Sequence, residues 1–595
     1  MAEFPVTRAI VRKRLIAIFI LTVLVTMLLI SRLAWIQIVQ ADELYEQAWK
    51  QWSHNVPIST ARGSIYDNQG RLLAGSTSVN TVAAIPPQID NPEAVAGALA
   101  PILEMDAQQI YELITMDRSA IYIKRKVDPD VSEAVREINI PGIIFFNEEK
   151  RYYPGDNIAS QVLGFVGMDQ GLAGVESYYE DYLSGSEGRL LYPADGRGKQ
   201  LPHTFSRYTL PQQGYDLHLA IDESIQHIVE RELARVMENS APKQAMALVL
   251  DPQSGALLAA ATKPDYNPGD YELYNPESWA LAPITSSFEP GSTLKMVTLA
   301  AVVEEGLFNP DEVYNCPGYT IVNDNRINCW TVDRGGHGDI TFYDSVGGSC
   351  NPAFIELGQR LGKEKLFHYL DAFGFGQATG IDYPGESSGM IFDLEQVGPL
   401  ELATTTFGQG ISVTPIQQVM AVTAMINGGY LYQPYIVEKI TDLDGSSLMK
   451  REPEVVRQVV SEETSAQLVD MMESVILDGT GYAAALEGYR VAGKTGTAEK
   501  LDELGNYSSS DYIYSLIGFA PVENPQLVLY VAVDGVTRGP RLGVHTSAPL
   551  FKNIMEDSLN YLQVSPSSTQ EHTGGEKEEH EDQEQEEEQD EQEEH

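Results

Sequence analysis

The stretch from Phe288 to Met296, which reads FEPGSTLKM, decides how the rest of this chain is interpreted. Its Pro-Gly pair interrupts the chain, and the segment after it, rich in Ala, Leu and Val, predicts a helix that begins near Ser292. Ser292 and Lys295 then lie on one face of that helix, within reach of each other. A lysine whose pKa is lowered takes the proton of a serine hydroxyl and makes the serine a nucleophile. Alone, this pair is a weak signal, because Ser-x-x-Lys recurs by chance in long chains, and a solvated surface helix is the favoured interpretation.

Two later motifs favour the catalytic interpretation. Ser349-Cys350-Asn351 lies downstream, and residues 494–497 read KTGT at the end of a short apolar run. The glycine of this tetrapeptide suits a strand edge where a substrate approaches the backbone. Ser-x-x-Lys, Ser-x-Asn and Lys-Thr-Gly, in this order, are the three motifs of penicillin-binding proteins and class A β-lactamases. Their joint occurrence predicts acyl transfer through a serine.

Length, charge and cysteine content limit the other classes of function. The chain has 595 residues, enough for two or three domains, and a formal net charge of −45. Fourteen of its last 25 residues are acidic, and the remainder is acidic as well. This argues against a nucleic-acid partner, which requires a basic surface. Cys316, Cys329 and Cys350 are too few for a disulfide scaffold and lack metal-ligand spacing.

An apolar segment near the N-terminus predicts a membrane anchor. Residues 15–38 are long and apolar enough to span a bilayer as one helix. Four basic residues precede this segment and three acidic residues follow it, which places residues 1–14 in the cytoplasm and the remainder outside. The alternative is a cleaved signal peptide, with residues 39–41 as the cleavage site. The length of the apolar segment favours the uncleaved anchor.

The rest of the chain divides into a pedestal, a catalytic domain and a tail. Residues 40–221 show a mixed pattern without acid–base groups, which predicts an elongated non-catalytic domain. Residues 222–563 predict an α+β domain whose separated strands converge on one sheet, and residues 564–595 predict a disordered acidic tail. In the pedestal we expect helices at 91–113 and 131–138 and a hairpin turn at 68–70. In the catalytic domain we expect helices at 222–239 and 547–562, and strands at 246–250, 256–261, 494–497, 514–520 and 527–534.

With these motifs the chain resembles the class B penicillin-binding proteins, which are membrane-anchored D,D-transpeptidases. Within that family it most resembles the septal and stage V sporulation protein D branch. The resemblance runs from the predicted anchor to about Leu562. Besides the three motifs, it rests on RGSIYD at 62–67, GVE at 174–176, CW at 329–330, GHG at 336–338, FGFG at 373–376, PGE at 384–386 and GQG at 408–410.

The resemblance implies a serine β-lactamase-like transpeptidase domain, with a five-stranded antiparallel sheet and helices, and a role for each motif residue. Ser292 is implied as the nucleophile, Lys295 as the general base and Ser349 as the proton relay to the leaving amine. The resemblance also implies that Asn351, Lys494, Thr495, Gly496 and Thr497 bind the substrate and that the backbone N–H groups of Ser292 and Thr497 form the oxyanion hole. It implies a reaction that needs no metal or organic cofactor.

The same resemblance implies the partners and the cellular process. The substrates are peptidoglycan stem peptides, cross-linked at the division septum or in the spore cortex, and β-lactams acylate the same serine. A SEDS-type glycan polymerase and division or sporulation proteins are the implied membrane partners.

Three other functions use part of the same sequence pattern. A D,D-carboxypeptidase or β-lactamase has the same motifs with water as the acceptor, but the long pedestal and single anchor argue against it. A β-lactam sensor needs a cytoplasmic signalling module, for which residues 1–14 leave no room. A non-catalytic division scaffold would have an inactive site, whereas this chain has every side chain of the three motifs.

Three kinds of residue near the motifs have a structural alternative. Asn351 could cap the helix that Pro352 opens, although its Ser-x-Asn setting predicts contact with substrate as well. His337, between two glycines, is expected to be a structural loop residue. Cys316, Cys329 and Cys350 are candidate redox residues, because an extracytoplasmic location permits a disulfide and a bridge to Cys350 would distort the site.

Overall fold

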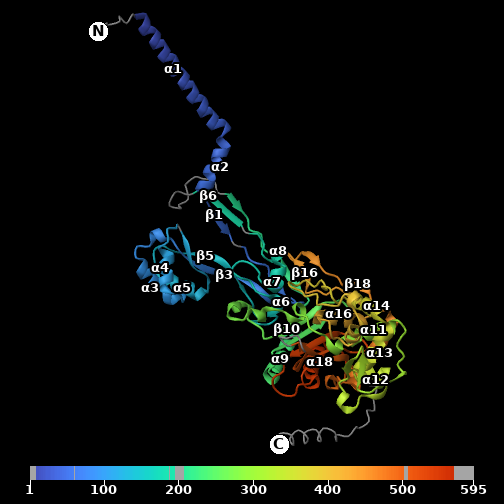
Figure 1. Cartoon of the computed structure of the whole chain (residues 1–595). Helices are drawn as coiled ribbons and strands as arrows, with labels where there is room; N and C mark the ends of the chain where they lie inside the picture. The colour runs from blue at the N-terminus through green and yellow to red at the C-terminus, as the bar shows by residue number, and fades with distance from the viewer. Residues whose placement is uncertain are drawn as a thin grey trace.

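A long helical stalk leads from the N-terminus to two packed domains (Figure 1). The computed structural model describes residues 8–58, 60–118, 120–186, 188–193, 207–501 and 507–567. The stalk consists of α1 (Arg8–Ala34), the π-helical η1 (Trp35–Val39) and α2 (Ala41–Trp52). Residues 8–39 are long and apolar enough to cross a membrane, and they include the predicted anchor. Of the predicted acidic tail, residues 568–595 lie outside the described residues.

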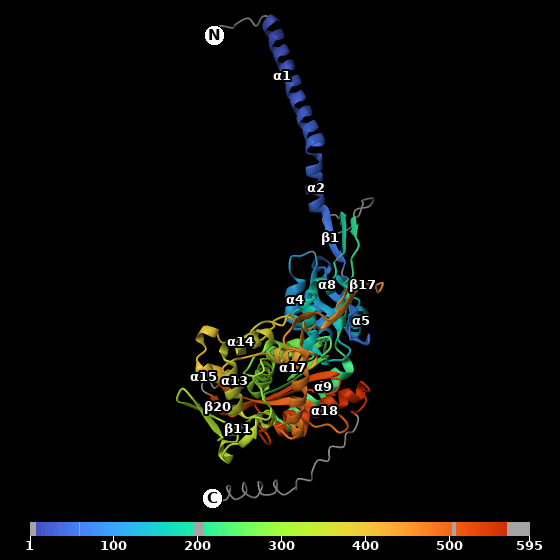
Figure 2. The same ribbon diagram turned by 90° about the vertical axis from the view of Figure 1, so that its right-hand side faces the viewer.

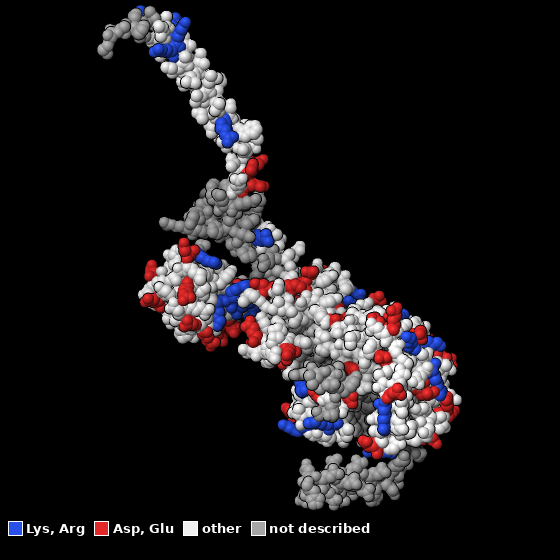
Figure 3. Space-filling view, viewed as in Figure 1, with Lys and Arg blue, Asp and Glu red and all other residues white. Residues whose placement is uncertain are grey.

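Charged side chains flank the apolar part of the stalk. Figure 3 shows basic side chains at the N-terminal end of α1 and acidic ones where α2 begins, with a mostly uncharged rod between them. Every described side chain within residues 8–33 is exposed, so this rod packs against nothing in the described chain. In the turned view, α2 and β1 (Ser53–Ile58) follow each other along the long axis toward the two domains (Figure 2).

The pedestal contains a compact head built around one long strand. β3 (Leu72–Ala84) pairs antiparallel with β5 (Ile143–Tyr152) on one side and β4 (Ile121–Val127) on the other. Helices α3 (Pro92–Leu103), α4 (Ala107–Ile114) and α5 (Pro129–Ile138) contribute to the head's own apolar core. Near the stalk, β1 forms a separate small sheet with β6 (Gly188–Pro193) and β7 (Arg207–Thr209).

The structure corrects one of the predicted pedestal helices. Residues 91–113 form two helices instead of one, because Glu104 ends α3 in the left-handed conformation with a φ of 51° and Asp106 caps α4. The helix predicted at 131–138 and the turn at 68–70 are confirmed. This turn connects β2 (Ile65–Tyr66) to β3.

The two domains share a sheet. β2 and β8 (Asp216–Leu219) both belong to the pedestal and pair in parallel. β8 in turn pairs with β16 (Val437–Thr441), and β16 pairs with β17 (Ser447–Lys450). With β3, β4 and β5 these strands form one seven-stranded sheet. Backbone hydrogen bonds therefore join the pedestal to the catalytic domain.

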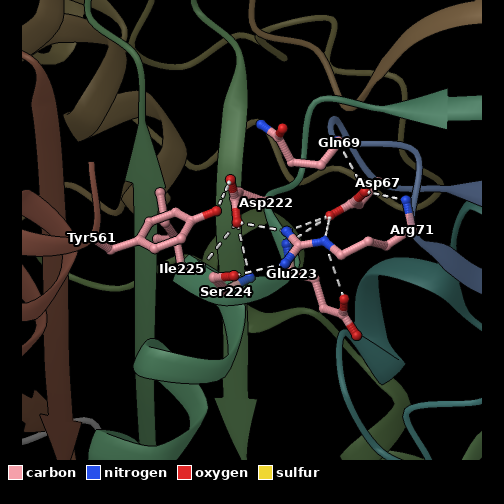
Figure 4. Close-up of polar contacts among 8 residues, drawn as sticks. All are labelled: Asp67, Gln69, Arg71, Asp222, Glu223, Ser224, Ile225 and Tyr561. Carbon is pink, nitrogen blue, oxygen red and sulfur yellow. Dashed lines mark hydrogen bonds and ion pairs between the residues drawn. The ribbon is translucent and has the colours of Figure 1, made fainter. Parts of the chain in front are cut away.

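A polar cluster closes the junction beside this sheet (Figure 4). The Arg71 guanidinium donates to Asp67 Oδ2 at 2.6 Å, to Asp222 Oδ1 at 2.9 Å and to Ser224 Oγ at 2.7 Å. Asp222 also caps α9 (Glu223–Ser240) and accepts a hydrogen bond of 3.1 Å from Tyr561 near the C-terminal end of the chain. Asp67 and Asp222 are nearly fully buried, so removal of the arginine would leave two unpaired buried carboxylates.

A second buried ion cluster links two pedestal motifs. Glu176 of the GVE motif accepts from Arg62 of the RGSIYD motif and from Arg151, each at 2.6 Å. Glu176 is fully buried, and the two arginines are less than a tenth exposed. The two motifs therefore act together as one structural element of the pedestal.

The catalytic domain is built on a five-stranded antiparallel sheet in the order β10-β9-β21-β20-β19. In that order the strands span Leu257–Lys263, Gln244–Leu250, Leu527–Asp534, Tyr507–Ala520 and Ala492–Leu501. The five predicted strands fall on these five, which confirms the α+β prediction. Residues 494–497 lie on β19, at one edge of the sheet.

Helices cover both faces of this sheet. Alternate residues of β9 point to opposite sides: Val249 packs in a core with α9 and α18 (Ser547–Tyr561), whereas Leu248 packs in the core that contains α11 (Lys295–Glu304) and α16 (Pro415–Ile426). Every residue of α16 is buried. Because α11 enters this second core directly after the Ser292 motif, packing fixes the position of the motif against the sheet.

Candidate active site

Ser292 lies in a tight 3₁₀ turn, η5 (Gly291–Leu294), which continues into α11. The predicted helix start is confirmed, with the tighter turn as its first part. Gly291 has a φ of +57°, and a Cβ at this position would lie 2.5 Å from the carbonyl oxygen of Thr497. A Cβ on Gly408 would lie 2.1 Å from the carbonyl oxygen of Gly291. The nucleophile turn is thus held between the edge strand and the GQG motif, with no room for side chains at either glycine.

Lys295 is fully buried and points at the second motif. Its Nζ donates to the Ser349 carbonyl oxygen at 2.7 Å, to Ser349 Oγ at 3.1 Å and to Asn351 Oδ1 at 2.7 Å. Within the described chain Lys295 makes no hydrogen bond to Ser292, although both belong to the same turn and helix start. In this structure the amine is therefore bound to the Ser-x-Asn motif.

Ser349 and Asn351 lie on the turn that connects α12 (Phe342–Gly347) to α13 (Asn351–Leu361). Ser349 adopts a φ of 51°, which is unfavourable for a residue with a Cβ. The N-cap position of α13 belongs to Cys350, so the Asn351 side chain does not serve as the cap. Instead it accepts from Lys295 and donates to the Asn328 carbonyl oxygen at 3.2 Å.

Lys494 approaches the same hydroxyl from the sheet. It is fully buried on β19, and its Nζ donates to Ser349 Oγ at 2.8 Å and to the carbonyl oxygen of Thr495 at 3.1 Å. Thr495 is half-buried and Thr497 is exposed. A Cβ on Gly496 would lie 2.3 Å from Ser515 Oγ on the neighbouring strand, so only glycine fits there. All three motifs therefore meet at one place.

Burial makes both lysines less basic, and the charge of Lys295 acts on Lys494 as well. Burial lowers the pKa of Lys295 to about 8. Burial, followed by the charge of Lys295, lowers the pKa of Lys494 well below its usual value. Both shifts favour the neutral amines, and a neutral Lys295 is the form that accepts a proton. An arriving carboxylate would reverse the shift on Lys494, because an opposite charge favours the ammonium.

Sequence reasoning missed residues that support the motifs from a distance. Thr480 Oγ1 lies 2.7 Å from Thr495 Oγ1, and the Thr480 N–H donates to the carbonyl oxygen of Gly347 just before the Ser349 turn. Trp330 Nε1 donates to the Gly348 carbonyl oxygen at 2.9 Å. Trp330 belongs to the family-like pair at 329–330, but the sequence assigns it no role, and a single threonine such as Thr480 carries no pattern, so neither contact was predicted.

The three cysteines and His337 converge on the back of the Ser349 turn. All three are buried free thiols, and their sulfur atoms and a ring nitrogen of His337 lie within 4.8 Å of one another. The spacing argument against metal ligands therefore does not hold in three dimensions, because four separate segments bring these residues together. His337 lies in a loop, as predicted, and its Nδ1 is 3.5 Å from Cys329 Sγ and 3.3 Å from Thr331 Oγ1, so it belongs to this cluster. The disulfide hypothesis stays a prediction.

Comparisons with known proteins agree with this geometry. The family model of the penicillin-binding protein transpeptidase domain matches residues 245–556, and that of the penicillin-binding protein dimerisation domain matches residues 57–219. Stage V sporulation protein D of Bacillus subtilis is 42% identical over 573 residues, covering 95% of this chain and 88% of that protein. Peptidoglycan D,D-transpeptidase FtsI of Escherichia coli is 31% identical over 560 residues, covering 93% and 92%.

A solved structure shows the same architecture with a β-lactam present. Penicillin-binding protein 3 of Mycobacterium tuberculosis, complexed with ampicillin, superposes with a TM-score of 0.67 at 26% identity, covering 87% of this chain and 98% of that one. The two family models, the identity to both relatives over nearly the whole chain and the meeting of the three motifs lead to one conclusion. The chain belongs to the penicillin-binding protein transpeptidases, as a class B-like member with both a dimerisation and a transpeptidase domain.

Proposed function

We propose that this protein is a peptidoglycan D,D-transpeptidase that cross-links stem peptides through an acyl-enzyme on Ser292. The observation that carries the proposal is the convergence of two buried amines, Lys295 and Lys494, on Ser349 Oγ at 3.1 and 2.8 Å, beside the turn that holds Ser292. An arrangement of nucleophile, base and proton relay at one place is what acyl transfer requires.

In the first half-reaction the Ser292 hydroxyl attacks the carbonyl carbon of the penultimate D-alanine. Neutral Lys295 takes the hydroxyl proton as the Oγ–C bond forms. Ser349, in contact with both lysines, passes a proton to the leaving nitrogen as the C–N bond breaks, and D-alanine departs. The backbone N–H groups of Ser292 and Thr497 are the proposed oxyanion hole, since η5 lies against β19 at this point.

The edge strand provides the proposed donor-binding surface. Among the described strands β19 pairs only with β20, so an extended peptide can align along its other edge. Lys494, Thr495 and Thr497 bind the terminal carboxylate, and Gly496 permits the close backbone contact. Asn351 binds the substrate amide, and to do so its side chain gives up some of its hydrogen bonding with Lys295.

In the second half-reaction the amine of another stem peptide attacks the ester. A new C–N bond forms, the C–Oγ bond breaks, and the proton lost by the amine returns to the Ser292 oxygen through Lys295. This acceptor step distinguishes a transpeptidase from a hydrolase, in which water takes the place of the amine.

We infer the cellular setting from the stalk and from the relatives. Residues 15–38 anchor the chain, with residues 1–14 in the cytoplasm and both domains outside, since basic residues lie at the N-terminal end of α1. The higher identity to stage V sporulation protein D than to FtsI supports a role in sporulation. A SEDS-type glycan polymerase is the proposed membrane partner of the stalk and pedestal.

The full-length chain in detergent tests the enzymatic proposal. Incubation with a labelled penicillin should place the label on the peptide that contains Ser292, as mapped by mass spectrometry, and Ser292→Ala should carry none. A donor stem peptide with an amine acceptor should then give the cross-linked product. Folded wild-type protein without label would exclude the acyl-serine mechanism, and release of D-alanine without cross-linked product would indicate a hydrolase.

A further inference from the structure

All three cysteines of the chain and one histidine meet at a single place outside the reaction centre. Cys316 ends β11 (Val313–Cys316), Cys329 follows β13 (Asn325–Asn328), His337 precedes β14 (Gly338–Thr341), and Cys350 is the N-cap of α13. The three cysteines are at most 1% exposed. The proposed catalytic steps use none of these four side chains.

The donor atoms of this cluster have the composition and spacing of a tetrahedral metal site. Three sulfurs and one imidazole nitrogen form one of the sets that bind structural zinc. With Zn–S of about 2.3 Å and Zn–N of about 2.0 to 2.1 Å, tetrahedral edges are about 3.8 Å between sulfurs and about 3.6 Å between sulfur and nitrogen. The observed Cys329 Sγ–His337 Nδ1 distance is 3.5 Å, and no pair of the set exceeds 4.8 Å. A shift of about 1 Å or less therefore completes the site.

The surrounding backbone already holds these donors together. A Cβ on Gly336 would lie 2.2 Å from the carbonyl oxygen of Cys316, so only glycine lets the His337 segment approach so closely. The Cys329 N–H donates to the Gly318 carbonyl oxygen at 2.8 Å. Trp330 is more than half exposed and His337 is half-buried, so the cluster lies near the surface, where a metal ion can enter.

We propose that Cys316, Cys329, His337 and Cys350 bind one divalent metal ion of the zinc class, and that this ion holds the Ser349–Asn351 turn in its active shape. Four protein ligands leave no open position, so the ion is structural and takes no part in acyl transfer. Its effect on the reaction comes through Cys350, which lies between Ser349 and Asn351. The left-handed backbone of Ser349 is the strained conformation that such a tether stabilises.

The metal content of the full-length chain tests the binding itself. The protein is purified in detergent with a thiol reductant and without chelator, and its metal content is measured by elemental mass spectrometry. It should contain about one zinc ion per chain. Cys316→Ser, Cys329→Ser and His337→Ala should each lose most of it. His368→Ala, an exposed histidine on α14 (Lys363–Ala372), is the matched control and should retain it.

Binding of Co²⁺ by the wild-type protein is a second test of the metal site, and it does not require that the variants fold. Wild-type protein stripped with a chelator should take up Co²⁺ and show the visible bands of tetrahedral cobalt with a thiolate charge-transfer band. Folded, fully reduced wild type that binds neither zinc nor cobalt would overturn the proposal. A stable disulfide that uses Cys350 in protein purified with reductant would overturn it too.

The positioning role rests on the proposed acyl-serine function, whereas metal binding does not. Removal of the metal from the wild type should lower the rate of labelling by penicillin about tenfold or more, which is the usual effect of losing a group that supports a site from the second layer of contacts. Added zinc should restore the rate. Labelling of Ser292 at an unchanged rate after complete metal removal would refute the positioning role. Absence of all labelling in the metal-loaded wild type would count against the proposed function. Metal binding would then still be tested independently by the cobalt spectrum.

Discussion

The active site has two halves that are built differently. Lys494 and Gly496 lie on β19, which pairs with β20 along nearly its whole length and packs against η5. Ser349 and Asn351 lie on a short turn between two helices, where Ser349 occupies a left-handed conformation. A sheet holds its residues through many backbone hydrogen bonds, whereas a turn of this kind depends on a few side-chain contacts. The strand half is thus rigid by construction, and the turn half requires support from outside.

Lys295 connects the two halves, so its removal should have the largest effect. Lys295→Met leaves Ser349 and Asn351 without their shared donor and Ser292 without its base. We expect the acylation rate to fall by roughly 10²- to 10⁴-fold, measured with a fluorescent penicillin under pseudo-first-order conditions. Lys365→Met, on the exposed surface of α14, is the matched control and should acylate normally. Retention of normal acylation by Lys295→Met would assign the base to another group.

The pH dependence should follow the same lysine. Because burial lowers the pKa of Lys295 to about 8, protonation below that pH removes the reactive neutral amine. The acylation rate should therefore drop about tenfold for each pH unit below 8 and level off above it. Stopped-flow measurements from pH 6 to 9 with an acid-stable β-lactam check this. A flat profile over the range would show that proton transfer from Ser292 does not depend on this amine.

Two substitutions at Ser349 separate the effect of its left-handed backbone from the effect of its hydroxyl group. Both Ser349→Ala and Ser349→Gly remove the hydroxyl that both lysines contact, so both should acylate roughly 10- to 100-fold more slowly. Ser349→Gly also removes the Cβ at a φ of 51° and should be more stable than Ser349→Ala by about 1 kcal/mol. Chemical denaturation of both variants measures this difference. Equal stabilities would show that the turn is not strained.

A substitution on the strand half should have the smallest effect on rate and a visible effect on stability. In Gly496→Ala the new methyl group meets Ser515 Oγ and Thr293 Cγ2, and overpacking of this kind costs about 1–3 kcal/mol. Acylation should slow by about tenfold or less. Gly97→Ala in α3 is the control, since a Cβ there meets nothing within 4 Å. If Gly496→Ala lowered the rate more than Ser349→Ala, the strand half would be the more sensitive one, contrary to our comparison.

Sequence patterns located the strand half more completely than the turn half. The apolar run before Lys494 and the alternation along β9 carry the period of strands, so their places in the sheet followed directly. The Ser349 turn has no such period, and its contacts come from Lys295, Asn328 and Thr480, which are distant in the chain. The role of Asn351 as a partner of Lys295, rather than a cap, depends on which residue opens α13, and helix boundaries are difficult to predict to within one residue.

The pedestal shows the same limit on a larger scale. Its long strand β3 contains Gly, Asn and Ala, which are depleted in strands, so the sequence indicated only a mixed region. The cysteine cluster was missed for a related reason. Metal-site patterns in sequence depend on short spacings, whereas here each ligand comes from a separate segment.

The antiparallel pairing of β8, in the pedestal, with β16, in the catalytic domain, has a mechanical consequence. A flexible linker between pedestal and catalytic domain would let the catalytic domain swing freely while the stalk stays fixed. Here, displacing one domain against the other means sliding strands of a common sheet, which stretches several hydrogen bonds together, and it also pulls on the buried Arg71 cluster. The pedestal and the transpeptidase domain should therefore move together as one body, and a force applied to either domain should displace both.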